Sequence, residues 1–178
     1  GLGAVGGMIA SKLQACGLCD LKVIVDSVRR SKYTEQGVTV NGSTCCFSYL
    51  CPDDMDEAAD WIILAVKNHH LSAVIDQIRP FVGPGTHLLS LLNGIDSEMI
   101  LGQAFGMEKP LYSFIVATDA VRVGTDIQYS NVGKIVLGEK GLSAPTTRVE
   151  MIRALLESAG IPCETPKDIL RELWWKFM

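Results

Sequence analysis

The sequence has no excess of basic residues and no long apolar run, and both absences exclude classes of protein. Its 178 residues carry 16 basic and 20 acidic side chains, a formal net charge of -4. We therefore expect neither a nucleic-acid partner nor an anionic membrane partner. The longest strongly apolar runs, such as residues 61–66, are far shorter than the roughly 20 residues that span a bilayer. We predict no signal peptide, because the chain opens on Gly1-Leu2-Gly3 without a charged region, and we expect a cytoplasmic protein.

Histidine is scarce, and the cysteines do not form a metal-binding pattern. His69 and His70 are adjacent and His87 stands alone, so we expect neither a histidine-based triad nor a metal centre. With 48% hydrophobic residues, the chain can build a core without disulfides, and its six cysteines suit free thiols. The spacing Cys16-Gly-Leu-Cys19 also occurs in redox and zinc motifs, but no second ligand pair completes it.

The distribution of apolar residues predicts an α/β fold. Short apolar runs alternate with segments of helical spacing, which is typical of a doubly wound, mostly parallel sheet with helices on both faces. Strands are predicted over residues 21–26, 61–66 and 86–92, and helices over 1–17, 71–81, 96–105 and 146–159. A hairpin is predicted over 37–47 with Asn41-Gly42 as its turn. Two later runs, 111–123 and 126–137, predict an antiparallel pair, and a last helix is predicted to begin at Pro166.

A glycine-rich motif, G-x-G-x-x-G, opens the chain. Its glycines allow a tight turn, close approach of a pyrophosphate to the backbone, and close packing of a helix on a strand. The helix N-terminus then presents N–H groups to the anion. The candidate cofactor-binding residues here are Gly1, Leu2, Gly3, Ala4, Val5 and Gly6. The motif predicts a dinucleotide site in a Rossmann-like domain, and a glycine-rich turn without a ligand is the alternative.

The residues after the second predicted strand leave the choice of cofactor open. Asp26 stands roughly 20 residues beyond the glycines, where a carboxylate binds both ribose hydroxyls and favours NAD. Arg29 and Arg30 follow it, and arginines there can bind a 2′-phosphate and favour NADP. The alternative for the arginines is a solvated helix start. Cofactor binding by Asp26, Arg29 and Arg30 is therefore predicted without a decision between NADP(H) and NAD(H).

Two polar residues follow predicted strands, where ligands of open α/β sheets bind. Lys67 follows residues 61–66, and Asn93 follows the next strand along the chain. Both are candidates for cofactor binding, and a surface lysine and a plain turn residue are the alternatives. Lys176 lies on the apolar stripe of the last helix with Ile169. A desolvated lysine there has a lowered pKa and can act as a general acid, whereas a snorkelling lysine is the alternative.

Together these motifs resemble the ketopantoate reductase (2-dehydropantoate 2-reductase) family. The matching segments are the glycine motif, Val66-Lys67, Leu92-Asn93-Gly94 and Glu172-Leu173-Trp174-Trp175-Lys176, in this order along essentially the whole chain. The resemblance implies reduction of the C2 carbonyl of 2-dehydropantoate to (R)-pantoate by NADPH, on the route to pantothenate and coenzyme A. It implies that Lys176 is the general acid, Asn93 positions cofactor and substrate, Lys67 lies near the nicotinamide, and Thr118, in a predicted long strand, lines the substrate site.

The resemblance also implies two domains. Residues 1–165 would be the dinucleotide-binding domain, without its first strand, and 166–178 would be the first helix of a helical substrate domain. We therefore expect these residues alone to bind dinucleotide and to turn over poorly or not at all. A homodimer formed through the second domain is a further expectation. The alternatives are a related dehydrogenase of another keto or hydroxy acid, and a non-catalytic dinucleotide-binding module.

Overall fold

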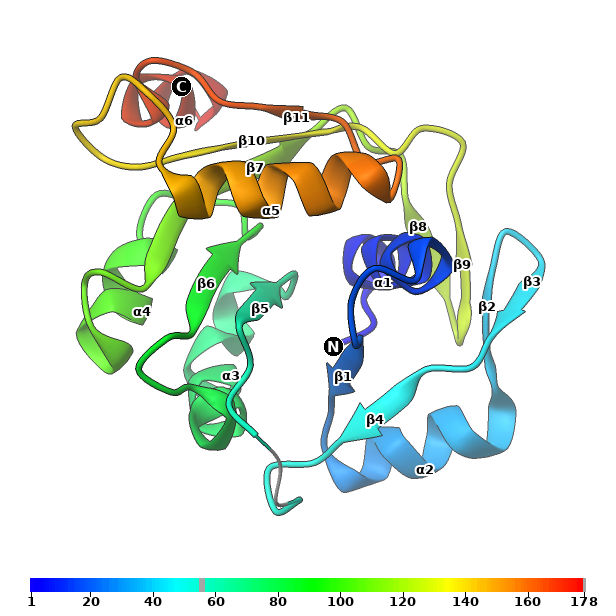
Figure 1. Ribbon diagram of the computed structural model, residues 1–178. Coiled ribbons are helices and arrows are strands. Elements are labelled where there is room, and N and C mark those ends of the chain that lie inside the picture. The colour runs from blue at the N-terminus through cyan, green and yellow to red at the C-terminus, as the bar shows by residue number, and fades with distance from the viewer. Residues whose placement is uncertain (55–56, 178) are drawn as a thin grey trace.

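The strands of this computed structural model, which describes residues 1–54 and 57–177, form three hydrogen-bonded sheets (Figure 1). A five-stranded sheet has the order β11-β10-β7-β6-β5, a parallel pair joins β1 to β4, and a four-stranded sheet has the order β3-β2-β9-β8. The strands are β1 (Lys22–Ile24), β2 (Val38–Val40), β3 (Ser43–Cys45), β4 (Ser48–Leu50), β5 (Trp61–Leu64), β6 (His87–Ser90), β7 (Pro110–Val116), β8 (Val121–Val123), β9 (Asp126–Gln128), β10 (Lys134–Gly138) and β11 (Cys163–Glu164).

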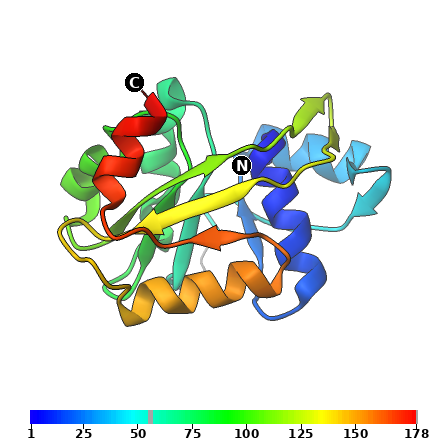
Figure 2. The ribbon, with the colours of Figure 1, turned by 90° about the horizontal axis from the view of Figure 1, so that it is seen from above.

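Helices cover both faces of the five-stranded sheet, which confirms the predicted α/β fold. The helices are α1 (Ala4–Cys16), α2 (Ser27–Gln36), η1 (Asn68–His70), α3 (Leu71–Ile78), η2 (Arg79–Phe81), α4 (Ser97–Phe105), α5 (Thr147–Ser158) and α6 (Ile169–Phe177). Buried residues of α1 and α5 share one core cluster, whereas those of α3 and α4 belong to another. Figure 2 shows α5 and α6 on opposite sides of β10. No helix within 1–54 or 57–177 is long and apolar enough to cross a membrane.

The central strands are apolar on both faces because both faces are covered. In β7, Leu111 and Ile115 are buried in the cluster with α1 and α5. Phe114 of the same strand packs with Ile169 and Leu173 of α6. Alternate residues of one strand therefore reach two cores, which is why the sequence shows an uninterrupted apolar run rather than an alternating one.

Several predicted turns and ends are confirmed. The hairpin of β2 and β3 turns at Asn41 and Gly42, whose φ angles are 47° and 78°. Two left-handed residues in a row are typical of this tight turn. Helix α1 ends at Gly17, with φ 65°. The last helix, however, begins at Ile169 rather than at the predicted Pro166, and the Asp168 carboxylate accepts a hydrogen bond from the Arg171 N–H at 3.1 Å.

The two long runs predicted over 111–123 and 126–137 are each divided into two strands, so this prediction was wrong in part. β7 pairs antiparallel with β10 in one sheet, and β8 pairs antiparallel with β9 in another. The break follows Ala117, which has φ 58°. The Asp119 carboxylate accepts hydrogen bonds from the N–H groups of Ser130 and Asn131, at 3.0 Å and 2.8 Å. These side-chain contacts replace strand pairing at the bend.

A cavity of about 840 Å³ lies between the β1–β4 pair and β5. Residues of both elements line it, among them Val23 of β1 and Ile62 of β5. In the described part of the chain β1 and β5 are not hydrogen-bonded to each other. The predicted sheet is therefore divided at this place. The strand expected ahead of the glycine motif stays a prediction.

Candidate active site

The glycine motif forms the turn into α1 and leaves room for a ligand. Gly3 is the residue before the helix, with extended backbone, and no side chain in the described residues caps this helix end. A Cβ on Gly3 would meet only the Ala65 carbonyl oxygen, at 3.6 Å, and nothing lies within 4 Å of the same position on Gly1. The N–H groups of the first turn are thus open to an anion. This geometry fits the pyrophosphate of a dinucleotide.

Gly6 keeps the turn tight. A Cβ on this residue would lie 2.4 Å from the Gly1 carbonyl oxygen and 3.5 Å from the Ala65 Cβ. Ala65 directly follows β5, so the carboxyl end of β5 adjoins the glycine turn. The turn and the strand end are therefore adjacent, and ligands of open α/β folds bind at such strand ends.

Arg122 of β8 holds the glycine turn from the other side, and the sequence analysis missed it. Its Nη1 donates to the Leu2 carbonyl oxygen and, at 3.1 Å, to the Tyr33 hydroxyl. The guanidinium carbon lies 5.3 Å from the centroid of the Tyr33 ring. Arg122 is 120 residues from Leu2, so no local pattern indicates the contact. A hydrogen bond from a charged donor to this carbonyl fixes the backbone of the turn.

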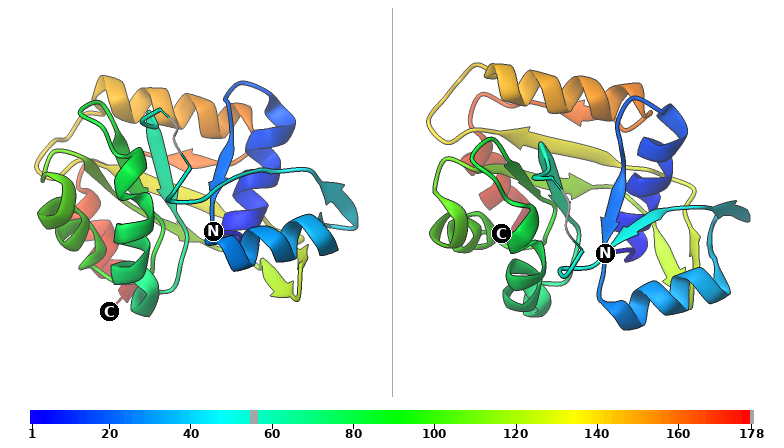
Figure 3. Two further views of the ribbon diagram at one scale, coloured as in Figure 1. Left: turned by 90° about the horizontal axis from the view of Figure 1, so that it is seen from below. Right: turned by 60° about the horizontal axis from the view of Figure 1, so that its bottom comes forward.

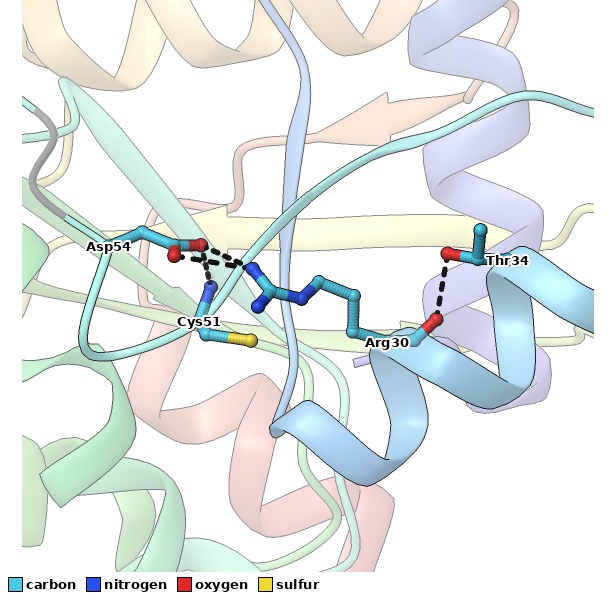
Figure 4. A network of polar contacts seen from close by, with 4 residues as sticks. All are labelled: Arg30, Thr34, Cys51 and Asp54. Atoms are coloured by element: carbon cyan, nitrogen blue, oxygen red, sulfur yellow. Dashed lines mark hydrogen bonds and ion pairs between the residues drawn. The ribbon is translucent and has the colours of Figure 1, made fainter.

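Asp26 caps α2, which begins beside the N-terminal turn (Figure 3). Its carboxylate accepts a hydrogen bond from the Arg29 N–H at 2.7 Å and lies 3.5 Å from the Arg29 Nε. Arg30 points elsewhere: its Nη1 lies 3.2 Å and 2.9 Å from the two carboxylate oxygens of Asp54 (Figure 4). Both arginines predicted for the cofactor are therefore paired with acids.

Lys67 follows β5, His69 and His70 lie in η1, and His87 lies on β6. Lys67 is exposed, and its carbonyl oxygen accepts from the His70 N–H at 2.9 Å. The rings of His69 and His70 lie against each other, with centroids 4.1 Å apart. His87 of β6 packs on Trp61, and burial, reinforced by nearby cations, lowers the pKa of its imidazole. We find no contact of these histidines with the candidate site in the described residues.

Lys176 and Asn93, 83 residues apart, are hydrogen-bonded to each other. The Lys176 Nζ donates to the Asn93 Oδ1 and to the Ile115 carbonyl oxygen, both at 3.0 Å. The same nitrogen lies 5.2 Å from the centroid of the Phe114 ring and 4.7 Å from that of the Phe177 ring. Burial lowers the pKa of Lys176 below the ordinary lysine value. The structure thus brings together two residues that the sequence predicted for the site.

The apolar stripe of α6 explains where Lys176 lies. Ile169 and Leu173 are 2% exposed and pack on Phe114 and Val136. Lys176 follows Leu173 by three positions, so it extends from the same helix face toward the edge of β7. Of the two interpretations given for this lysine, the partly desolvated one fits its half-buried position.

Thr118 lies in the bend after β7, so its placement in a long strand was wrong. Its hydroxyl donates to the Asn131 carbonyl oxygen at 3.3 Å and contacts the Met8 sulfur at 3.7 Å. The hydroxyl also accepts from the Ala120 N–H. Local hydrogen bonds of this kind favour a turn over a strand. Its described hydrogen bonds do not reach Lys176 or Asn93, and its role in lining the site stays a prediction.

A buried polar network lies beneath the segment that carries Asn93. The hydroxyls of Ser90 and Ser97 are 2.8 Å apart, and the Ser97 hydroxyl donates to the Glu98 carboxylate at 3.0 Å. The Ser113 hydroxyl donates to the Ser90 carbonyl oxygen at 2.5 Å. Glu98 is 2% exposed, and burial raises its pKa. The network ties the end of β6 to the start of α4 and so fixes both ends of the Asn93 segment.

Comparison with known proteins gives consistent matches. The family described as ketopantoate reductase PanE/ApbA matches residues 1–141. The 2-dehydropantoate 2-reductase of Mesorhizobium japonicum (strain LMG 29417 / CECT 9101 / MAFF 303099) is 24% identical over 200 residues, which cover 99% of this chain and 61% of that protein. The structure of 2-dehydropantoate 2-reductase from Geobacter metallireducens GS-15 matches with a TM-score of 0.83 and 26% identity, over 99% of this chain and 59% of that one.

A more distant structure shares the fold alone. D-mandelate dehydrogenase, solved with NADH and anilino(oxo)acetate, matches with a TM-score of 0.80 and 18% identity, over 99% of this chain and 58% of that one. All three proteins are longer than this chain, which spans about three fifths of each.

Proposed function

This chain belongs to the ketopantoate reductase family, and we propose that it forms the cofactor-binding part of a reductase that converts 2-dehydropantoate to (R)-pantoate. The family is one of NAD(P)-dependent oxidoreductases with a Rossmann-like fold. The observation that carries the proposal is the hydrogen bond between Lys176 and Asn93. Asn93 follows β6, whose carboxyl end lies beside that of β5, since Leu64 pairs with Ser90. The pair therefore belongs to the sheet edge that holds the glycine turn.

The lysine suits the proton transfer of a carbonyl reduction. A bound reduced nicotinamide supplies a hydride to the C2 carbonyl, whose oxygen then needs a proton. The Lys176 Nζ holds a proton in a half-buried position and stabilises negative charge near it. Asn93 accepts from Nζ through its Oδ1. Within the described residues its Nδ2 makes no hydrogen bond, so it is available to a ligand.

The remaining cofactor residues are proposed from the same edge of the sheet. The turn formed by residues 1–6 would hold the pyrophosphate, Asp26 with Arg29 and Arg30 would lie at the adenosine ribose, and Lys67 would lie near the nicotinamide. We keep Thr118 as a proposed part of the substrate site. The open space at Gly1 and Gly3 supports the first of these assignments.

The domain division is also a proposal. Residues 1–165 would form the dinucleotide-binding unit, and 166–178 would begin a helical substrate domain. That the relatives are longer than this chain supports the division. A homodimer through the second domain, and a place on the route to pantothenate and coenzyme A, rest on the family resemblance.

A second candidate substrate is another 2-keto acid. Lys176 and Asn93 would contact only the carbonyl group that all such acids share. Neither residue lines the cavity of about 840 Å³ between the β1–β4 pair and β5. A related dehydrogenase of another keto or hydroxy acid is therefore the alternative that the test must separate.

The proposal is tested by replacing Lys176 and comparing binding with turnover. In the full-length protein, Lys176→Ala should keep the affinity for the reduced cofactor and lose about 100-fold or more of 2-dehydropantoate-dependent cofactor oxidation. Lys140→Ala, which removes an exposed lysine between β10 and α5, is the matched control and should change neither. Undiminished turnover in Lys176→Ala would contradict the assigned role. Turnover of other 2-keto acids by the full-length protein without turnover of 2-dehydropantoate would support the alternative substrate. Cofactor binding by the full-length protein without any turnover would support a non-catalytic module.

A further inference from the structure

The end of β1 presents a carboxylate where the adenosine ribose of a dinucleotide is proposed to lie. Asp26 follows β1 by two residues and caps α2. One of its oxygens accepts from the Arg29 N–H at 2.7 Å, which fixes the carboxylate at the start of the helix. Its side chain is 38% exposed, so a ligand can still reach it. A carboxylate at this place accepts hydrogen bonds from ribose hydroxyls.

Arg30, whose positive charge could bind a 2′-phosphate beside this carboxylate, is already paired with another acid. The Arg30 Nη1 contacts both oxygens of Asp54, at 3.2 Å and 2.9 Å. Asp54 in turn accepts from the Cys51 N–H at 2.7 Å, so the backbone after β4 fixes it. Figure 4 shows the guanidinium reaching from α2 to this segment. To bind a 2′-phosphate, Arg30 would have to leave a two-contact ion pair that the backbone supports.

Arg29 offers no replacement. Its Nε lies 3.5 Å from the Asp26 carboxylate, so its charge is offset by the acid that a 2′-phosphate would approach. The four side chains, two acids and two arginines, carry no net charge together. A 2′-phosphate would add a further charge of about −1.5 to −2 beside Asp26. The phosphate and the Asp26 carboxylate carry charges of the same sign and would repel each other, even at the exposed edge of a protein.

We propose that Asp26 and Asp54 make this site prefer NADH over NADPH. The Asp26 carboxylate accepts a hydrogen bond from the 2′-hydroxyl of NADH and repels the 2′-phosphate of NADPH. The ion pair with Asp54 keeps Arg30 from binding that phosphate. The inference rests on the proposed function, because it requires that the glycine turn binds a nicotinamide dinucleotide. It reverses the NADPH preference that the family resemblance implies.

The test is equilibrium binding of NADH and NADPH to the purified protein, followed by nicotinamide fluorescence. The dissociation constant for NADH should be at least about tenfold below that for NADPH. Asp26→Asn should reduce the ratio of the NADPH dissociation constant to the NADH dissociation constant, because it weakens NADH binding and strengthens NADPH binding. Asp54→Asn keeps an acceptor for the Cys51 N–H and frees Arg30, so it should strengthen NADPH binding and leave NADH binding unchanged. Asp20→Asn removes an exposed acid at the other end of β1 and should leave the ratio unchanged.

Arg30→Ala provides a second check that does not depend on the acid variants. Because Arg30 is paired with Asp54, removal of the Arg30 side chain should not weaken NADPH binding relative to NADH binding. Tighter binding of NADPH by the unaltered protein would overturn the proposal. So would a selective loss of NADPH affinity in Arg30→Ala, or a ratio unmoved by both acid variants. Failure of both dinucleotides to bind would instead contradict the proposed function.

Discussion

The glycine turn allows its structural and binding roles to be separated by two single-methyl substitutions. A Cβ on Gly6 would lie 2.4 Å from the Gly1 carbonyl oxygen, so the backbone must shift in Gly6→Ala. Overpacking of this kind costs about 1–3 kcal/mol. At about 2–4 °C for each kcal/mol in a chain of this size, Tm should fall by about 2–12 °C.

Gly3→Ala should show the opposite pattern. Its backbone is extended, and the new methyl would be in ordinary contact with the Ala65 carbonyl oxygen at 3.6 Å. We expect the free energy of unfolding to stay within about 0.5 kcal/mol of the original. The methyl would, however, occupy the space proposed for the pyrophosphate, and dinucleotide affinity should fall about tenfold or more.

Calorimetry and cofactor titration of the same samples would measure both effects. Gly85→Ala is the control, because a Cβ there meets nothing within 4 Å and the backbone is not left-handed. It should change neither Tm nor affinity. Unchanged dinucleotide affinity in Gly3→Ala would refute the assignment of this turn to the pyrophosphate. An unchanged Tm in Gly6→Ala would refute the steric argument.

Three further predictions concern pH and the supports of the site. A general acid acts in its protonated form, so kcat/KM should fall as pH rises through the lowered pKa of Lys176. A pH profile of kcat/KM that shows no decline below the ordinary lysine value of 10.5 would contradict the role of Lys176. The raised pKa of Glu98 means that the folded state favours its protonated form. The contribution of Glu98 to stability should therefore be greatest below the ordinary value of 4.5 and should fall as pH rises through the raised pKa. Urea unfolding of Glu98→Gln should lack this fall, and an equal fall in both proteins would exclude Glu98 as its source. Arg122→Ala should weaken dinucleotide binding about tenfold by releasing the glycine turn, whereas the exposed Arg79→Ala should not; equal affinities in a titration would argue against the contact.

Local patterns were sufficient to predict much of the fold. Asn41-Gly42 specified a turn that needs two left-handed residues, and Gly17 specified the end of α1. The break at Ala117 could not be foreseen, because apolar and β-branched residues continue on both sides of it. Its cause is a set of hydrogen bonds that the Asp119 carboxylate accepts from a segment 11 residues away.

The candidate site shows the same limit. Periodicity placed Lys176 on an apolar helix face, and the end of a strand placed Asn93 at the ligand-binding edge, so their proximity could be expected. The contact of Arg122 with the glycine turn depends on how two sheets meet, and no spacing in the sequence records it. Likewise, the arginine spacing indicated a phosphate site, whereas the partner of Arg30 became evident only when the segment after β4 was placed.

The most direct test of the central claim follows one hydrogen atom. The purified full-length protein would be incubated with 2-dehydropantoate and NADH that carries deuterium at both C4 positions of the nicotinamide, and the product would be analysed by mass spectrometry and NMR. Our account predicts pantoate with deuterium at C2, and loss of this product in Lys176→Ala. Cofactor oxidation without deuterated pantoate, or the same yield in the lysine variant, would contradict it.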